Sequence, residues 1–400
     1  MISFFISMYF CGMISFENTQ VAFQGKSDKE LKRAYWLFKM VGSPSFVKFG
    51  KWATNVALKL RLPIKGLIKK TIFSQFCGGE SISESISTSK QLAEYNVKTI
   101  LDYSIEGKTL DVDFESTVNE IIDTIHEGKN NDHIPFAVFK VTGICLFGVL
   151  ERANNGTEHL SASDREKYDQ LVGRIDQICS AAFENDVPVF IDAEESWIQD
   201  GIDRIAEQMM EKYNKQRAIV YNTLQMYRHD RLNYFQQTIA HARSSGYHLG
   251  VKIVRGAYME KERNRAAEKG YPSPIQPDKA ASDRDFNAAL LLAVENLDCV
   301  AICAGSHNEE SALILANAME EKGIQFDDNR VYFAQLLGMS DHISFNLANA
   351  NYNVAKYVPY GPVKEVMPYL LRRADENTSV AGQTSRELSL IMKERKRRKS

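Results

Sequence analysis

One alternation in this sequence constrains the fold more than any other feature. From about Thr99 onward, short runs rich in β-branched and aromatic residues alternate eight times with longer stretches of amphipathic spacing, such as 163–186 and 231–247. Strand, helix and strand in this order predict parallel pairing with right-handed crossovers. The eight runs are "TILDYS" (99–104), "FAVFKVTG" (136–143), "PVFIDAEES" (188–196), "AIVYNTLQ" (218–225), "GVKIVRGAY" (250–258), "VAICAGSHN" (300–308), "VYFAQLLG" (331–338) and "KYVPYG" (356–361).

Two α/β architectures satisfy such an alternation, a closed (β/α)8 barrel and an open doubly wound sheet. A doubly wound sheet usually carries a phosphate-binding glycine loop, and neither G-x-G-x-x-G nor GxxxxGK[ST] occurs in this chain. Eight units over about 290 residues match the barrel. We therefore predict three parts: an N-terminal segment and helical region (1–95), a (β/α)8 TIM-like barrel (96–390) and a basic tail (391–400).

The chain ends contain the stretches that bear on membranes. The opening "MISFFISMYFCGM" is shorter than the roughly 20 residues that span a bilayer, and it lacks the basic start of a signal peptide. A more ordinary polar sequence begins at Met13, so the first dozen residues need not belong to the folded protein. Residues 32–70 mix basic and apolar side chains, which suits anionic lipid and helix packing equally well. The final "KERKRRKS" favours a solvated, disordered tail.

Composition narrows the class of protein. A formal net charge of -2 gives no overall attraction to nucleic acid, so no such partner is expected. The six cysteines are scattered without a CxxC pair, which is typical of reduced thiols in the cytosol. The eight histidines show no HExxH or comparable spacing, so no metal site is predicted. We expect a cytoplasmic protein with no signal peptide or transmembrane helix.

Polar residues gather where the predicted strands end, and barrel enzymes place their chemistry at these ends. Each residue alone has a plain structural explanation, such as a lysine that reaches solvent or an aspartate that caps a helix. Together, these cations, acids and aromatic walls predict a pocket for an anionic, partly apolar ligand. The residues are Lys140, Asp192, Glu194, Glu195, Gln225, Lys252, Arg255, Ser306, His307, Asn308, Leu336, Leu337, Tyr357 and Tyr360.

The stretch "MPYLLRRADEN" follows the eighth run and is predicted to form its helix. On a helix, Tyr369, Arg372, Arg373 and Glu376 share one side, because steps of three and four residues connect them. A pair between Arg372 and Glu376 would stabilise the helix by only a few tenths of a kcal/mol. Guanidinium groups instead bind carboxylate or phosphate through two parallel hydrogen bonds. The two arginines therefore predict an anion clamp over the barrel mouth.

These residues resemble the proline dehydrogenase family, the FAD-dependent enzymes that begin proline breakdown. The resemblance rests on "FKVTG", "IDAEES", "KIVRGAYMEKER", "SHN", "LLGM" and "YLLRRADEN", which occur in the family order. It extends from "FCGGES" near Cys77 to "NTSVAGQTSREL" ending at Leu388. It implies a distorted (β/α)8 barrel with FAD across the C-terminal strand ends, in the stand-alone form without a fused aldehyde dehydrogenase domain.

The resemblance also implies a role for each residue. Asp192 and Lys252 are expected to be catalytic: Asp192 would hydrogen-bond Tyr357 and hold the pocket in shape, and Lys252 stands where many bacterial members have an arginine on flavin N5. Arg373 is expected to contact both proline and flavin. The implied substrate-binding residues are Lys140, Tyr258, Leu336, Tyr357, Tyr369, Arg372 and Arg373. The implied cofactor-binding residues are Gln225, Lys252, Arg255, Gly256, Ala257, Ser306, His307, Arg373 and Glu376.

The implied reaction is hydride transfer from C5 of L-proline to N5 of FAD, which yields 1-pyrroline-5-carboxylate, and the electrons then pass to a membrane quinone. No residue is a clear dedicated base, so we expect the amine proton to leave to solvent. Tyr357 leaves little room for a hydroxyl group on C4, which predicts proline and not hydroxyproline as the substrate. The basic region around Lys48 to Lys70 is expected to contact the anionic inner membrane peripherally.

Two points stay open at this stage. The family has an acidic gating residue after the first strand, and Glu106 in "SIEGK" is the nearest match, but the loop pattern differs and the role is not assigned to it. Other classes of protein also fit the residues: a barrel that clamps a phosphorylated metabolite with its arginine pair, or a non-catalytic membrane-associated scaffold. Bound flavin that L-proline bleaches would exclude both.

Overall fold

Eight parallel strands form a closed barrel in the order β1-β2-β3-β4-β5-β6-β7-β8. The computed structural model describes residues 14–43, 45, 48, 50, 65–104, 111–379 and 383–400, with only the backbone described for 111–112, 374–379 and 383–384. The strands are β1 Val97–Tyr103, β2 Phe136–Lys140, β3 Val189–Asp192, β4 Val220–Gln225, β5 Leu249–Val254, β6 Val300–Gly305, β7 Val331–Leu336 and β8 Val354–Tyr360. Because β8 pairs with β1, the sheet has no open edge. The predicted (β/α)8 barrel is confirmed.

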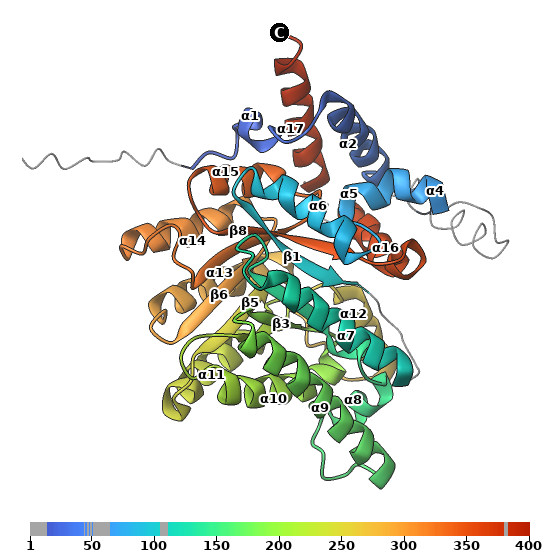
Figure 1. The fold of residues 1–400 in the computed structure, drawn as a ribbon, viewed down its shortest axis with the longest axis vertical. Helices are drawn as coiled ribbons and strands as arrows, with labels where there is room; N and C mark the ends of the chain where they lie inside the picture. Colours follow the sequence, from blue (N-terminus) through green and yellow to red (C-terminus); the bar gives the residue numbers. More distant parts are fainter. Residues whose placement is uncertain are drawn as a thin grey trace, which may run out of the picture.

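Helices follow the strands and cover the outside of the barrel (Figure 1). Helix α9 shows why the sequence forms them: Leu171, Ile175 and Ile178 recur at helical spacing and are fully buried, and Ser161 caps the first turn. The helices are α7 Asp111–Gly128, α8 Phe147–Ala153, α9 Ala162–Glu184, α10 Ser196–Tyr213, α11 Arg231–Ser245, α12 Met259–Lys269, α13 Lys279–Glu295, α14 Glu309–Glu321, α15 Asp341–Asn349 and α16 Val363–Ser379, with a 3-10 turn at Val141–Gly143.

Alternation along the strands decides which side chains enter the barrel. Ile100, Phe136 and Phe190 belong to one buried cluster inside it, whereas their strand neighbours pack outward against the helices. Phe136 and Phe190 stack there with ring centroids 4.4 Å apart. The same two-residue period, continued toward the C-terminal ends, brings a layer of polar side chains above this aromatic layer. This polar layer is composed of Asp102, Lys140, Asp192, Lys252 and Tyr357.

Both ends of the described chain pack together at one end of the molecule (Figure 1). Phe38 of α2 and Leu390 and Ile391 of α17 share a buried apolar cluster. The elements outside the barrel repeat are α1 Thr19–Ala22, α2 Asp28–Val41, α4 Lys65–Ile68, a π-helical turn Lys69–Phe73, α5 Ser74–Phe76, α6 Ile82–Ala93 and α17 Gln383–Arg397. The N-terminal region is thus mainly helical where it is described, as predicted.

The expectation of a disordered basic tail is wrong. Residues 391–397 continue helix α17, and Glu394 in that helix is fully buried. Arg397 and Arg398 each lie 2.8 Å from Glu394, and Arg398 also donates hydrogen bonds to the carbonyls of Phe23 and Lys26. The basic residues are ordered because a buried carboxylate and N-terminal carbonyls accept their hydrogen bonds, which composition alone does not show.

The two stretches that bear on membranes, residues 1–13 and most of 44–64, lie outside the described residues. Within the part of the chain that the structure describes, no helix combines the length and the apolar character that crossing a bilayer requires.

Candidate active site

Asp192, the last residue of β3, is the centre of an ion-pair cluster in the barrel mouth. Lys140 Nζ from β2 lies 2.8 Å from Oδ2, and the Tyr357 hydroxyl from β8 donates to the same oxygen over 2.7 Å. Lys252 from β5 pairs with Oδ1. Burial alone would raise the pKa of Asp192, but the two lysines hold this pKa well below its usual range. The mouth therefore contains an ionised carboxylate between two cations at neutral pH.

Asp102 in β1 belongs to the same layer, and the sequence analysis missed it. Its side chain is buried, and Oδ2 accepts a hydrogen bond from the Ser104 hydroxyl. Burial raises the pKa of Asp102, and the nearby charges of Lys140 and Lys252 only partly oppose that shift. The signal that would have found it is an aspartate inside the apolar run "TILDYS", two residues after the inward-facing Ile100.

Glu194 and Gln225 form a second buried set beside the mouth. The Glu194 carboxylate accepts hydrogen bonds from the backbone N–H and the hydroxyl of Thr142, over 2.9 Å and 2.5 Å. Gln225 Nε2 donates to the Glu194 carbonyl over 2.7 Å. Burial raises the pKa of Glu194 to about 7 even though these hydrogen bonds lower it. Glu194 is therefore a carboxyl group that titrates near neutral pH next to Lys140.

The predicted cofactor residues of β5 and β6 lie together. Arg255 donates to the Ser306 hydroxyl over 2.7 Å and to Asp283 over 2.6 Å. Gly256 follows with a φ of 128°, a conformation that L side chains rarely adopt, and an added Cβ would meet the Tyr227 ring at 2.5 Å. Gly256 and Ala257 are exposed. The turn after β5 thus presents open backbone next to an arginine.

His307, in the loop after β6, is held as a neutral imidazole. Its Nδ1 lies 3.0 Å from the Ser340 hydroxyl oxygen. Burial, together with the charges of Lys356 and Arg373, lowers the pKa of His307 to about 3. At physiological pH this ring is a hydrogen-bonding group and not a cation.

Helix α16 brings the arginine pair to the same mouth. Tyr369 is buried in an apolar cluster that Leu336 also contacts. The Arg373 guanidinium is buried and lies 5.1 Å from the Tyr369 ring centroid, and its charge acts on His307. Burial raises the pKa of Tyr258, and the charges of Lys140 and Arg372 oppose that shift. The charge of Arg373 thus acts on His307, and the charge of Arg372 acts on Tyr258.

Two residues that were expected at the mouth face the other way. The Tyr360 hydroxyl lies 2.9 Å from Thr124 Oγ1 and donates to Glu120 of α7 over 3.0 Å. Leu337 packs against the outer core cluster. The expectation was wrong because Tyr360 is three residues after the inward Tyr357, so the two-residue period turns it outward. The side chain of Glu376 and all of Glu106 lie outside the described residues.

A metal centre finds no support in the described part of the chain. No group of three or more His, Cys, Asp and Glu side chains lies close enough there to bind an ion. The five cysteines in this part, including Cys299 and Cys303, are free and buried.

Similarity to known proteins agrees with this geometry. The family model described as proline dehydrogenase matches residues 85–386. The mitochondrial proline dehydrogenase 1 of Caenorhabditis elegans is 36% identical over 341 residues, which cover 82% of this chain and 54% of that protein. The chain thus spans about half the length of this relative. The hydroxyproline dehydrogenase of Xenopus laevis is 31% identical over 423 residues, which cover 97% of this chain and 91% of that protein.

A solved structure is similar in fold. The crystal structure of proline utilization A from Bdellovibrio bacteriovorus, inactivated by N-propargylglycine, matches with a TM-score of 0.70 and 20% identity. The match covers 92% of this chain and 37% of that one, and at this identity it shows the fold alone. The family model, by contrast, covers most of the barrel, from helix α6 to the start of α17. The chain belongs to the proline dehydrogenase family.

Proposed function

We propose that the protein oxidises L-proline to 1-pyrroline-5-carboxylate with FAD as its cofactor. One observation carries the proposal: the Asp192 carboxylate is shared by Lys140, Lys252 and Tyr357, and the charges of Lys140 and of Arg372 on α16 act on the same tyrosine, Tyr258. Oxidation removes a hydride from C5 and a proton from the ring nitrogen, and a C=N double bond forms. Membership of the family supports this choice of substrate class.

The chemistry of the side chains fits a flavin dinucleotide. Arg255 and the exposed turn at Gly256 and Ala257 combine a cation with open backbone, a combination suited to a pyrophosphate. Neutral His307 is suited to a hydrogen bond with the flavin ring. We propose the same site for Gln225, Ser306, Arg373 and Glu376, and we assign Lys252 to flavin N5. Bound FAD supplies the two-electron acceptor.

The substrate would be bound by its carboxylate. Arg372, Arg373 and Lys140 provide three cations for this group, and charge-assisted hydrogen bonds of this kind fix both position and orientation. Tyr258, Leu336, Tyr357 and Tyr369 would surround the pyrrolidine ring. Asp192 keeps Lys140 and Tyr357 in place through the contacts given above. The amine proton leaves to solvent, since no residue is assigned as its base.

A second substrate deserves a direct comparison, because the Xenopus relative that covers nearly the whole chain is a hydroxyproline dehydrogenase. In this protein the Tyr357 side chain is held toward the mouth by its hydrogen bond to Asp192. A hydroxyl group on C4 of the substrate would meet this ring. We therefore propose proline as the preferred substrate, and a higher kcat/KM for 4-hydroxyproline would contradict the proposal.

The electrons are proposed to pass to a membrane quinone, which calls for peripheral contact with an anionic membrane. Trp36 on α2 and Leu67 on α4, which are 50% and 66% exposed, belong to the mixed basic and apolar segment 32–70. Lys65 and Lys69 both pair with Glu80, at 2.9 Å and 2.8 Å, so they offer less charge to lipid than the sequence suggests. Apolar contact therefore has to supply much of the binding.

Co-sedimentation with phosphatidylserine-containing vesicles tests the membrane contact. The double variant Trp36→Glu, Leu67→Glu should reduce the bound fraction severalfold, because it places two charges at the lipid surface. Phe183→Glu is the matched control, since Phe183 is 51% exposed and belongs to α9, a helix that lies away from α2 and α4 (Figure 1). Equal sedimentation of the double variant and the control would rule out this surface.

The central test is the absorption spectrum of the purified full chain. We expect bound flavin, and anaerobic addition of L-proline should bleach it. A colourless protein that binds no added FAD would reject the proposed function, and a bound flavin that proline leaves oxidised would reject the proposed substrate.

A further inference from the structure

The loop between β7 and α15 follows directly on Leu336, a proposed wall of the substrate pocket. Two of its residues have left-handed backbone conformations, Gly338 with a φ of 76° and Ser340 with a φ of 51°. Glycine adopts this region readily, whereas serine does so rarely. Ser340 is fully buried, so the contacts that hold it in this conformation come from surrounding protein groups.

Distant parts of the chain hold this loop. Gln75 Nε2, which precedes the barrel, donates to the Gly338 carbonyl over 3.0 Å. Asp341, at the start of α15, pairs with the fully buried Lys356 of β8 at 2.9 Å and with Lys26 at 2.9 Å. These contacts hold the residues before and after Ser340. The backbone N–H of Ser340 itself has a different hydrogen-bond partner.

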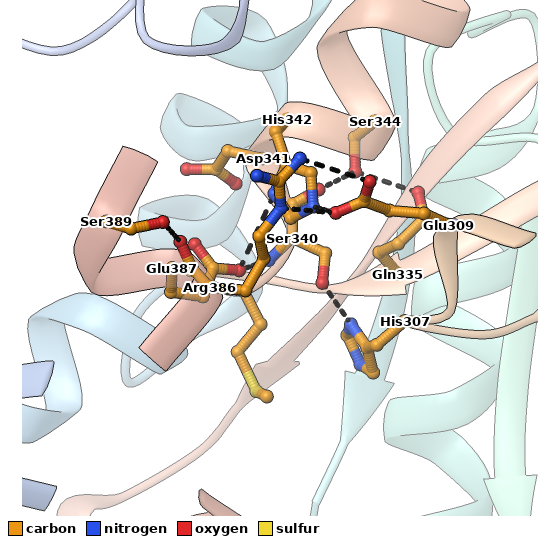
Figure 2. A network of polar contacts seen from close by, with 12 residues as sticks. His307, Glu309, Gln335, Ser340, Asp341, His342, Ser344, Arg386, Glu387 and Ser389 are labelled. Carbon is orange, nitrogen blue, oxygen red and sulfur yellow. Dashed lines mark hydrogen bonds and ion pairs between the residues drawn. The ribbon is translucent and has the colours of Figure 1, made fainter. Parts of the chain in front are cut away.

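That partner is Glu387 of the terminal helix α17, whose Oε1 accepts the hydrogen bond of the Ser340 N–H (Figure 2). The Glu387 side chain is 3% exposed, and His342 Nδ1 lies 4.0 Å from the same oxygen. The preceding Arg386 binds Glu309 at 2.7 Å instead. Helix α17 thus reaches the backbone of the loop through one buried carboxylate.

Ser340 connects Glu387 to a residue at the mouth of the barrel, His307. Its hydroxyl oxygen lies 3.0 Å from His307 Nδ1 (Figure 2). The hydroxyl group therefore gives Nδ1 of the imidazole its hydrogen-bond partner and fixes the direction in which the ring points. A shift of Ser340 would change the orientation of the His307 ring and the hydrogen bond at Nδ1.

We propose that Glu387 is a positioning residue of the active site: it holds Ser340 in its left-handed conformation, and Ser340 in turn fixes the His307 ring through the hydrogen bond at Nδ1. The consequence for flavin binding rests on the proposed function, in which His307 contacts the flavin.

The test compares Glu387→Ala with Glu387→Gln in the full chain. The glutamine retains an oxygen that accepts the Ser340 hydrogen bond, and the alanine removes it. Two properties are measured. The first is the 15N chemical shifts of the His307 ring in flavin-free protein, assigned with His307→Gln, and the second is the dissociation constant of added FAD by flavin fluorescence.

For Glu387→Ala we expect altered ring shifts and about tenfold weaker FAD binding, which is the effect of one misplaced hydrogen bond. For Glu387→Gln we expect values near those of wild type.

Glu394→Ala is the matched control. Glu394 lies two helical turns later on α17, is fully buried and pairs with Arg397 and Arg398. Its loss should lower the thermal midpoint and leave the His307 ring shifts unchanged. If Glu394→Ala altered the His307 ring shifts in the same way as Glu387→Ala, a general loss of stability would explain both changes. This result would overturn the proposal.

Further outcomes separate the positioning role from the proposed function. Ring shifts in Glu387→Ala that equal those of wild type would also overturn the proposal, whatever the protein does with FAD. If the wild type itself binds no FAD, the proposed function fails, and the ring shifts still decide the positioning role. If Glu387→Ala does not fold, Glu387→Asp replaces it, because the shorter side chain draws the carboxylate away from the Ser340 N–H and should alter the His307 shifts in the same way.

Discussion

Tyr357 and Asp192 are joined across the barrel mouth by a hydrogen bond of 2.7 Å from the tyrosine hydroxyl to Oδ2. The same oxygen lies 2.8 Å from Lys140 Nζ, so one carboxylate oxygen sets the position of an aromatic wall and of a cation. Burial and the nearby carboxylates of Asp102 and Asp192 raise the pKa of Tyr357 well above its usual value. The tyrosine therefore stays protonated and acts as a donor.

The Tyr357 ring is expected to exclude substrates with a hydroxyl group on C4. Tyr357→Ser should raise kcat/KM for 4-hydroxyproline relative to proline by about tenfold, the discrimination that a pocket of changed size and polarity provides. Tyr357→Phe retains the ring and should keep the wild-type preference while it loses the bond to Asp192. Steady-state kinetics with both substrates measures the ratio of the two kcat/KM values. An unchanged ratio in Tyr357→Ser would show that the Tyr357 ring does not determine specificity.

The two arginines of α16 are expected to bind the substrate carboxylate with different side effects. Arg372→Met and Arg373→Met should each raise the KM for proline by about 10- to 150-fold, since a charge-assisted hydrogen bond contributes roughly 1.5–3 kcal/mol. Arg373→Met should also weaken FAD binding, because Arg373 acts on the His307 side.

Arg330→Met serves as the control for the arginine pair, because Arg330 pairs with Asp328 at the opposite end of β7 and is half-exposed. A wild-type KM in both α16 variants would contradict the anion clamp. Equally weakened FAD binding in Arg372→Met and Arg373→Met would contradict the prediction that only Arg373 also supports the cofactor.

Glu194 is expected to make the stability of the protein depend on pH. Its pKa is about 7 in the folded protein and 4.5 in its ordinary range, so between these values the folded state keeps a proton that the unfolded state has lost. The stability that this group contributes is present below about pH 4.5 and is lost as the pH rises toward 7. The change amounts to about 3 kcal/mol at most.

Urea unfolding at pH 5 and pH 8 measures this effect. Glu194→Gln removes the titrating group, so the difference in the free energy of unfolding between the two pH values should become smaller than in wild type. Glu166→Gln, at an exposed position on α9, should leave the difference unchanged. If Glu194→Gln showed the same difference in the free energy of unfolding as wild type, the pH dependence would come from a group other than Glu194.

The loop after β7 is expected to tolerate no side chain at Gly338. A Cβ there would meet the Gln75 carbonyl oxygen at 2.0 Å, and the backbone φ is 76°. Gly323 has a similar φ of 65° with no atom within 4 Å of an added Cβ. Gly323→Ala should cost about 1–2 kcal/mol of stability from its backbone conformation alone. Gly338→Ala should cost about 2–3 kcal/mol more, because the backbone must also move. Equal thermal midpoints for the two variants would show that the clash is relieved cheaply.

The amino-acid sequence was enough to predict the barrel and most of the side chains at its mouth. A two-residue period in the strands and a helical period between them are local properties of the chain, so the eight units were predictable. Their places at the predicted strand ends pointed to Asp192 and Lys252, helical spacing and guanidinium chemistry pointed to the arginine pair, and the resemblance to the family then implied their roles. The same two-residue period places the Tyr360 side chain outward and the Asp102 side chain inward. It predicts these directions correctly only when the bounds of the strands are known.

The contacts among these side chains, in contrast, depend on the three-dimensional packing of the chain. Lys140, Lys252 and Tyr357 come to one carboxylate because the closed barrel directs the inward side chains of β2, β3, β5 and β8 toward a common centre. The basic tail is ordered because its arginines meet a buried Glu394 and the carbonyls of the N-terminal segment. Glu387 reaches Ser340 across 47 positions of sequence. Contacts of this kind depend on the packing of distant segments, and a local pattern of residues contains no record of that packing.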